Sequence, residues 1–149
     1  MNTQEYLHPK GELDISIYSS EGLLKEKIHV PNLVVQTGRD YIARRMANTD
    51  DGVMSHMSVG EDNTATSTLQ TALLDEITGS RTTLDSTAVA NNVVTYTATF
   101  DPGIGTGAIV EAGIFNAGTS GTMLCRTVFP VVNKAVDDTM VITWTITIS

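Results

Sequence analysis

Apolar and polar residues alternate along much of the chain, most clearly near the C-terminus. In residues 139–148, threonines separate most of the apolar side chains of Met140, Ile142, Trp144, Ile146 and Ile148. Successive side chains of a β-strand point to opposite faces of a sheet, so this spacing predicts a strand with one apolar face. We expect Trp144 and its neighbours to lie in a sheet-built core.

The N-terminal half predicts a β-hairpin and then a short helix. Residues 12–18 and 23–30 alternate, and residues 19–22 form a turn between them. Pro31 lacks an amide hydrogen, so we expect it to interrupt the ladder.

Thr37 and Asp40 have the spacing of helix-capping residues. Ile42 and Met46 lie four residues apart, which predicts an apolar stripe on a helix of roughly ten residues. A short strand over residues 56–60 and a polar loop over 61–68 are expected to follow.

A second helix is possible after this loop. Leu69, Leu73, Leu74 and Ile77 recur at helical spacing, with Ser67 and Gln70 in capping-box positions and Gly79 as a stop signal.

The remainder reads as successive strands over residues 82–89, 93–100, 108–115, 122–129 and 139–148, with a turn at Asn91 and Asn92. The predicted fold class is mainly β, an antiparallel β-sandwich with one or two short helices. The length fits a single domain over residues 1–149, with residues 1–10 as an N-terminal arm that reaches a neighbouring subunit.

Composition supports a sheet and argues against two partner classes. The 22 threonines favour strands, and charged residues make up only 17% of the chain. A net charge of −8 argues against a nucleic-acid partner, because phosphate binding requires clustered Lys and Arg. The one basic pair, Arg44 and Arg45, is interpreted as a solvated helix face or an ion pair. No apolar run approaches the length of a membrane span, so no membrane association is expected.

The candidates for chemistry are all interpreted structurally, and we expect no enzyme activity, cofactor or metal. Cys125 is expected to be a buried residue in a strand, and its being the sole cysteine excludes an internal disulfide. The glycine-rich residues 103–107 precede a predicted strand, which indicates a turn and not a phosphate-binding loop. Glu111 lies within an apolar strand, where a hydrogen bond to backbone amides is favoured over a role as a catalytic acid. The three histidines, His8, His29 and His56, lack the spacing of metal ligands. The paired acids are expected at solvated loop ends; they are Asp50 and Asp51, Glu61 and Asp62, and Asp137 and Asp138.

Three segments of the C-terminal half carry a resemblance to a protein family. They are VEAGIFNA at residues 110–117, GTMLCRTVF at 121–129 and TMVITWTITI at 139–148. In this order they resemble a widespread group of tailed-bacteriophage virion structural proteins, and the first also resembles a domain of phage tail-collar fibre proteins. NLVVQTG at residues 32–38 and MSVG at 57–60 extend the resemblance into the N-terminal half.

The resemblance implies a structural, non-catalytic component of a phage particle, assembled in the host cytoplasm. We expect a homo-oligomer, with a trimer favoured, that decorates or cements the capsid by binding the major capsid protein. The alternative is a neck, tail or baseplate fibre or adaptor protein. A further alternative, a host-glycan-binding module, is disfavoured because aromatic residues make up only 5% of the chain.

Overall fold

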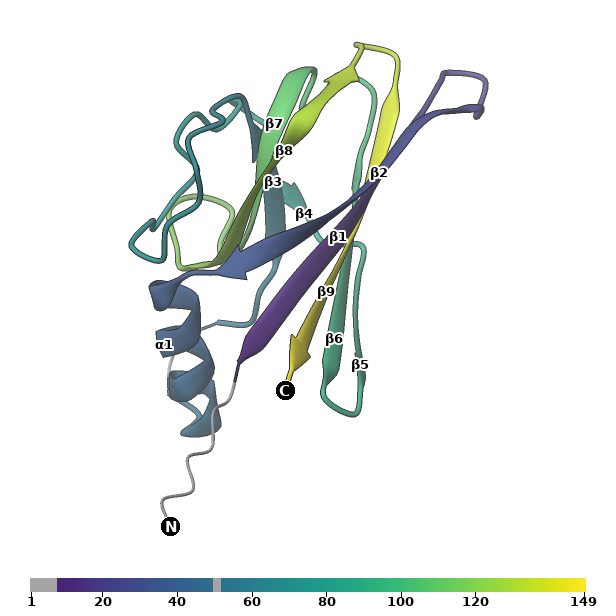
Figure 1. Cartoon of the computed structure of the whole chain (residues 1–149). Helices are drawn as coiled ribbons and strands as arrows, with labels where there is room; N and C mark the ends of the chain where they lie inside the picture. The colour runs from purple at the N-terminus through teal and green to yellow at the C-terminus, as the bar shows by residue number, and fades with distance from the viewer. Residues whose placement is uncertain (1–7, 50–51) are drawn as a thin grey trace.

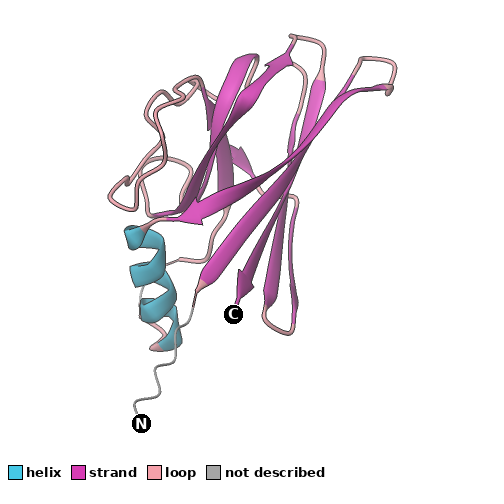
Figure 2. Cartoon of the chain, in the orientation of Figure 1, coloured by secondary structure: helices cyan, strands magenta, loops and turns pink. Residues whose placement is uncertain are grey.

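A computed structural model describes residues 8–49 and 52–149. Within these ranges the chain is mainly β, as predicted, with a single short helix (Figure 2). The elements are β1 (Pro9–Tyr18), β2 (Leu24–Val34), α1 (Gln36–Met46), β3 (His56–Gly60), β4 (Thr82–Thr83), β5 (Ser86–Ala90), β6 (Val93–Phe100), β7 (Gly107–Phe115), β8 (Met123–Lys134) and β9 (Thr139–Ile148).

The strands form one antiparallel sheet that curls into a half-barrel, a sandwich-like arrangement (Figure 1). The strand order is β4-β3-β7-β8-β2-β1-β9-β6-β5. We call β3, β7 and β8 the covered half and β5, β6 and β9 the threonine half. Between the two halves, β2 crosses the molecule beside β1 and ends near α1 (Figure 1).

The core lies between the two halves. Trp144 is 0% exposed on β9, and its pleat neighbours Ile142 and Ile146 are buried with it. They belong to one cluster with side chains of the covered half such as Ile109 and Ile114. The period-two prediction for residues 139–148 is therefore confirmed in both its bounds and its buried face.

The expectation that Pro31 would interrupt the ladder is wrong. β2 continues through Pro31, which lies opposite Glu12 of β1. Proline is tolerated in a strand where no neighbour needs its amide. On its other side, the Pro31 carbonyl accepts a hydrogen bond from Thr127 Oγ1 at 2.9 Å, and β2 then changes partner, so that Leu33 and Val34 pair with β8.

Helix α1 forms where it was expected, but its predicted cap is wrong. Of its predicted apolar stripe, Ile42 packs against the core and Met46 does not. No side chain caps its N-terminus at Val35; Thr37 Oγ1 instead donates to the carbonyl of Met123, and Asp40 accepts from Gln36 Nε2. Tyr41 is buried, whereas Met46 is exposed. Among the described residues, no helix is long and apolar enough to cross a membrane.

The possible second helix does not form. Ser67 and Gln70 make one of the two contacts of a capping box, because the Ser67 amide donates to Gln70 Oε1. The Ser67 side chain instead accepts from the Leu69 amide, and the Gln70 amide donates to the Ser67 carbonyl. The turn then ends, and the amides of Leu74 and Asp75 donate to Glu111 on β7. Tertiary hydrogen bonds thus replace the helical ladder that local spacing favoured.

Three strand predictions need correction, one because the strand divides in two and the others at their ends. Residues 82–89 divide into β4, which pairs with β3, and β5, which pairs with β6, because the Leu84 amide bonds to Ser55 and the Asp85 amide to Thr97. β8 continues beyond residue 129 to Lys134. β1 begins at Pro9, so residues 9–10 of the expected arm belong to the sheet; residues 1–7 lie outside the described residues.

Candidate functional site

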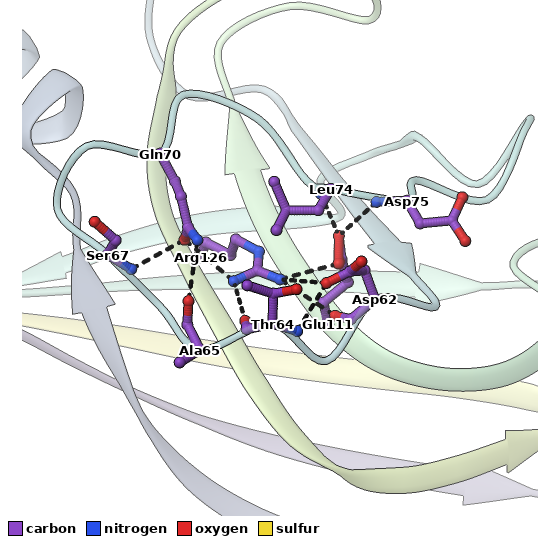
Figure 3. Close-up of polar contacts among 9 residues, drawn as sticks. All are labelled: Asp62, Thr64, Ala65, Ser67, Gln70, Leu74, Asp75, Glu111 and Arg126. Carbon is purple, nitrogen blue, oxygen red and sulfur yellow. Dashed lines mark hydrogen bonds and ion pairs between the residues drawn. The ribbon is translucent and has the colours of Figure 1, made fainter.

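A buried arginine on the outer face of the covered half donates hydrogen bonds to a long loop. Arg126 of β8 is 0% exposed. Its Nη1 donates to the Thr64 carbonyl at 2.9 Å and to Gln70 Oε1 at 3.1 Å, and its Nη2 donates to the Asp62 carbonyl at 3.2 Å. All three acceptors belong to the segment 61–80, which lies over β7 and β8 (Figures 1 and 3).

Glu111 of β7 completes this group. It is 0% exposed, and its Oε2 lies 3.1 Å from Arg126 Nη2. Its Oε1 accepts from the Leu74 amide at 2.9 Å and from the Asp75 amide at 3.4 Å (Figure 3). We call Asp62, Thr64, Gln70, Leu74, Asp75, Glu111 and Arg126 the Arg126 cluster.

The strands position this ion pair through a bulge and two glycines. The register of β7 on β8 shifts between Ile109 and Glu111, so Ala112 and Ile114 contact the core while Glu111 faces outward. Gly113 lies opposite Arg126, and a Cβ there would meet Leu73 at 2.9 Å. A Cβ on Gly60 would lie 2.5 Å from the Asp75 carbonyl oxygen and 2.8 Å from Glu111.

The arrangement acts as a clamp. Burying two charges is costly unless they are paired and their remaining hydrogen bonds are satisfied. Here the segment 61–80 supplies partners for both Nη atoms of Arg126 and for Glu111 Oε1, whereas the buried Arg126 Nε has no hydrogen-bond partner. The cluster therefore fixes the segment to the sheet. The prediction that Glu111 bonds backbone amides is confirmed. Arg126 was not predicted as the partner of Glu111, although the neighbouring predicted strands 108–115 and 122–129 were a signal for it.

A second arginine holds the far end of the same segment. Arg81 Nη2 donates to Glu76 Oε1 at 2.7 Å, and Nη1 donates to the Ser120 carbonyl at 2.7 Å. Its guanidinium carbon lies 3.7 Å from the centre of the Phe115 ring, a cation–π contact. The segment is therefore anchored on the outer face at both ends.

The outer face of the threonine half contrasts with this. On β6 and β9, Thr95 pairs with Thr145 and Thr97 pairs with Thr143, all half-exposed. In the part of the chain that the structure describes, no loop or helix lies over these strands (Figure 1). We call Thr95, Thr97, Thr143, Thr145 and Thr147 the threonine face.

The three histidines lie apart, and one of them binds two acids. On the exposed face of β1 and β2, His29 Nδ1 lies 2.8 Å from Asp14 and Nε2 lies 2.9 Å from Glu12. Hydrogen bonding to Asp14, with a smaller effect of Glu12, raises the pKa of His29 above its ordinary value of 6.5. Alternation on the two predicted strands was a signal for this contact. His56 Nδ1 lies 2.8 Å from Ser55 Oγ.

The expectation of solvated acidic loop ends is wrong for Asp138, which is only 4% exposed. Its Oδ2 accepts from Lys25 Nζ at 2.7 Å and from the Ala135 amide at 2.9 Å. The Lys25 hydrogen bond holds the pKa of Asp138 below its ordinary value. Hydrogen bonding from Thr64 likewise lowers the pKa of Asp62. Asp50 and Asp51 lie outside the described residues.

The remaining candidates are placed as structural residues. Cys125 is fully buried in β8, as predicted, and burial raises the pKa of its thiol. The glycine-rich residues form a turn before β7, as expected, with Gly103 and Gly105 at positive φ, and the last of them, Gly107, begins β7. Arg44 and Arg45 are half-buried in the last turn of α1.

Neither a cluster of metal-ligating side chains among the described residues nor a similar known protein assigns a chemistry to the chain. Among residues 8–49 and 52–149, no group of three or more His, Cys, Asp and Glu side chains could hold a metal ion. No protein-family model, curated protein or solved structure matches the chain.

Proposed function

We propose that this chain is a structural, non-catalytic component of a tailed-phage virion that associates with identical copies and decorates or cements the capsid. Its partners would be further copies of itself and the major capsid protein. The host cytoplasm is the proposed place of assembly, and the finished particle the proposed location.

One observation carries this proposal: the residues that resemble phage virion proteins make structural contacts in this fold. In the stretch EAGIFN, Glu111 binds the amides of Leu74 and Asp75, and Gly113, which lies opposite Arg126, makes room for Leu73. Asn116 closes the turn that follows, because its Oδ1 accepts from the Thr122 amide at 2.7 Å. The motif thus serves folding, which supports a building block over a catalyst.

The alternative location is the neck, tail or baseplate, where a compact adaptor would use the same fold. Copy number and symmetry distinguish the two locations. A decoration protein covers the shell in many copies, whereas a neck or tail protein surrounds one axis in few.

The test is to image particles that carry this chain. Virions are purified on a density gradient, the chain is identified by mass spectrometry, and its density is located by electron cryo-microscopy with the fold as a template. Density over the capsid lattice supports decoration, and the same map tests the expected trimer. Density at the tail vertex supports the alternative. Absence of the chain from intact, DNA-filled particles would contradict a virion role.

A further inference from the structure

The two edges of the sheet differ in their protection. β4, at one edge, is a two-residue strand, and short edge strands limit pairing with other chains. β5, at the other edge, has five residues that are all exposed, with β6 as its partner among the described strands. A terminal strand directs the amides and carbonyls of one side away from its sheet, where they can pair with another strand.

The side chains of β5 also lack the usual edge protection. The strand reads Ser-Thr-Ala-Val-Ala, without a charge or a proline. Thr87 and Val89 lie opposite Tyr96 and Val94 of β6, and opposed residues share a face. Val89 therefore lies on the core side of the sheet, yet it is 70% exposed. The apolar inner face of the sheet is buried at β6 but continues onto β5, where it is exposed.

Charge restricts which surfaces two copies can bring together. Each copy carries a net charge of −8, so most surfaces of two copies repel one another. Residues 86–100 and 139–149 contain no Asp, Glu, Lys or Arg, and they form β5, β6 and β9. The threonine half is thus a surface at which identical copies meet without opposing like charges.

We infer that the β5 edge binds the β5 edge of a second copy, antiparallel, so that the two sheets become continuous. The occupant is a second copy because the strand is uncharged in a strongly acidic chain. Two-fold pairing centred on Ala88 places Thr87 of each copy opposite Val89 of the other and covers both valines. This inference rests on the proposed homo-oligomer and names its contact. A two-fold contact gives pairs of copies, which differ from the trimer that the sequence analysis favoured.

A cysteine at the proposed axis tests the contact directly. Ala88→Cys is made in the otherwise native chain, where Cys125 is fully buried and does not compete. Mild oxidation is expected to give a covalent dimer. The matched control is Ala135→Cys, because Ala135 is also exposed but lies in the turn between β8 and β9. It is expected to give no covalent dimer under the same conditions.

A charge at the same edge tests it without cross-linking. Val89→Lys places two ammonium groups near each other in the pair and removes the apolar burial of both valines. We expect the dimer Kd to rise by at least about tenfold, with unchanged thermal unfolding of the subunit. Val136→Lys is the control, because Val136 is 61% exposed far from this edge. Mass photometry or sedimentation velocity gives the dissociation constants.

The outcomes separate this inference from the proposed function. A dimer that Ala88→Cys traps and Val89→Lys weakens supports the β5 contact. An oligomer that neither variant affects overturns the β5 contact and leaves the homo-oligomer standing. A monomer at every concentration, without cross-linking at residue 88, overturns both the contact and self-association, while imaging of the virion still tests the location.

Discussion

The two halves of the sheet differ in how their outer faces are covered. The covered half places a charged pair, Glu111 and Arg126, under the segment 61–80, which supplies hydrogen-bond partners. The threonine half displays uncharged hydroxyl side chains, and no described segment of the chain covers them. An unpaired buried charge has a high free-energy cost, so losing the covering segment would strongly destabilise the covered half. Moving a threonine hydroxyl from water into a protein contact costs less free energy. The covered face thus specifies a cover from its own chain, and the threonine face is suited to a neighbour.

The largest expected effect comes from breaking the buried pair. Arg126→Met leaves the Glu111 carboxylate without its cation and frees three acceptors of the segment 61–80. We expect the free energy of unfolding to fall by about 3–5 kcal/mol, measured by urea denaturation. Thr145→Val on the threonine half is the control, and we expect it to stay within about 0.5 kcal/mol of the native protein. Equal effects at both sites would remove the contrast between the halves.

Removing both charges should lower the free energy of unfolding by less than the sum of the two single substitutions. Glu111→Leu alone leaves Arg126 unpaired, whereas Glu111→Leu with Arg126→Met leaves no buried charge. The double-mutant cycle is expected to give a favourable coupling of about 1–3 kcal/mol. Additive effects would show that the two side chains stabilise the segment 61–80 independently.

A smaller effect is expected from one added methyl group. Gly60→Ala brings a Cβ to 2.5 Å from the Asp75 carbonyl oxygen, a backbone atom that cannot rotate away. We expect a loss of about 1–3 kcal/mol of unfolding free energy. Ala88→Val on the uncovered edge is the comparison, and its subunit stability should change by less than about 0.5 kcal/mol. A Gly60→Ala variant as stable as the native chain would contradict tight closure of the segment 61–80 over the sheet.

The smallest effect is expected at the exposed ion pair beside the threonine half. His29 contacts Asp14 and Glu12 and has a raised pKa, so its protonated form favours the folded state. This stabilisation is complete below pH 6.5 and is lost as the pH rises through the raised pKa of the folded protein. Asp14→Asn should bring the pKa back toward 6.5, measured by NMR titration of the imidazole. A native His29 that titrates at or below 6.5 would contradict the contact.

Local alternation was enough to predict most of the sheet. It gave the bounds of β6 and β9 and the burial of Trp144, because a strand with one exposed and one buried face must alternate. It also indicated the role of Glu111, since a carboxylate among apolar residues needs donors.

The cover of the sheet could not be predicted from local pattern. The spacing of Leu69, Leu73 and Ile77 satisfies a helix as well as a loop, and the choice depends on Glu111, which competes for the amides of Leu74 and Asp75. The helix cap failed for a similar reason: Thr37 binds the Met123 carbonyl, a partner distant in sequence. Contacts between remote segments decided both cases.

Hydrogen–deuterium exchange over a dilution series tests most directly the claim that one half is closed by its own chain and the other by a neighbour. We predict that amides of β5 gain protection as protein concentration rises, while those of residues 61–80 stay equally protected throughout. Protection of β5 that does not depend on concentration, or a concentration-dependent change confined to residues 61–80, would contradict the account.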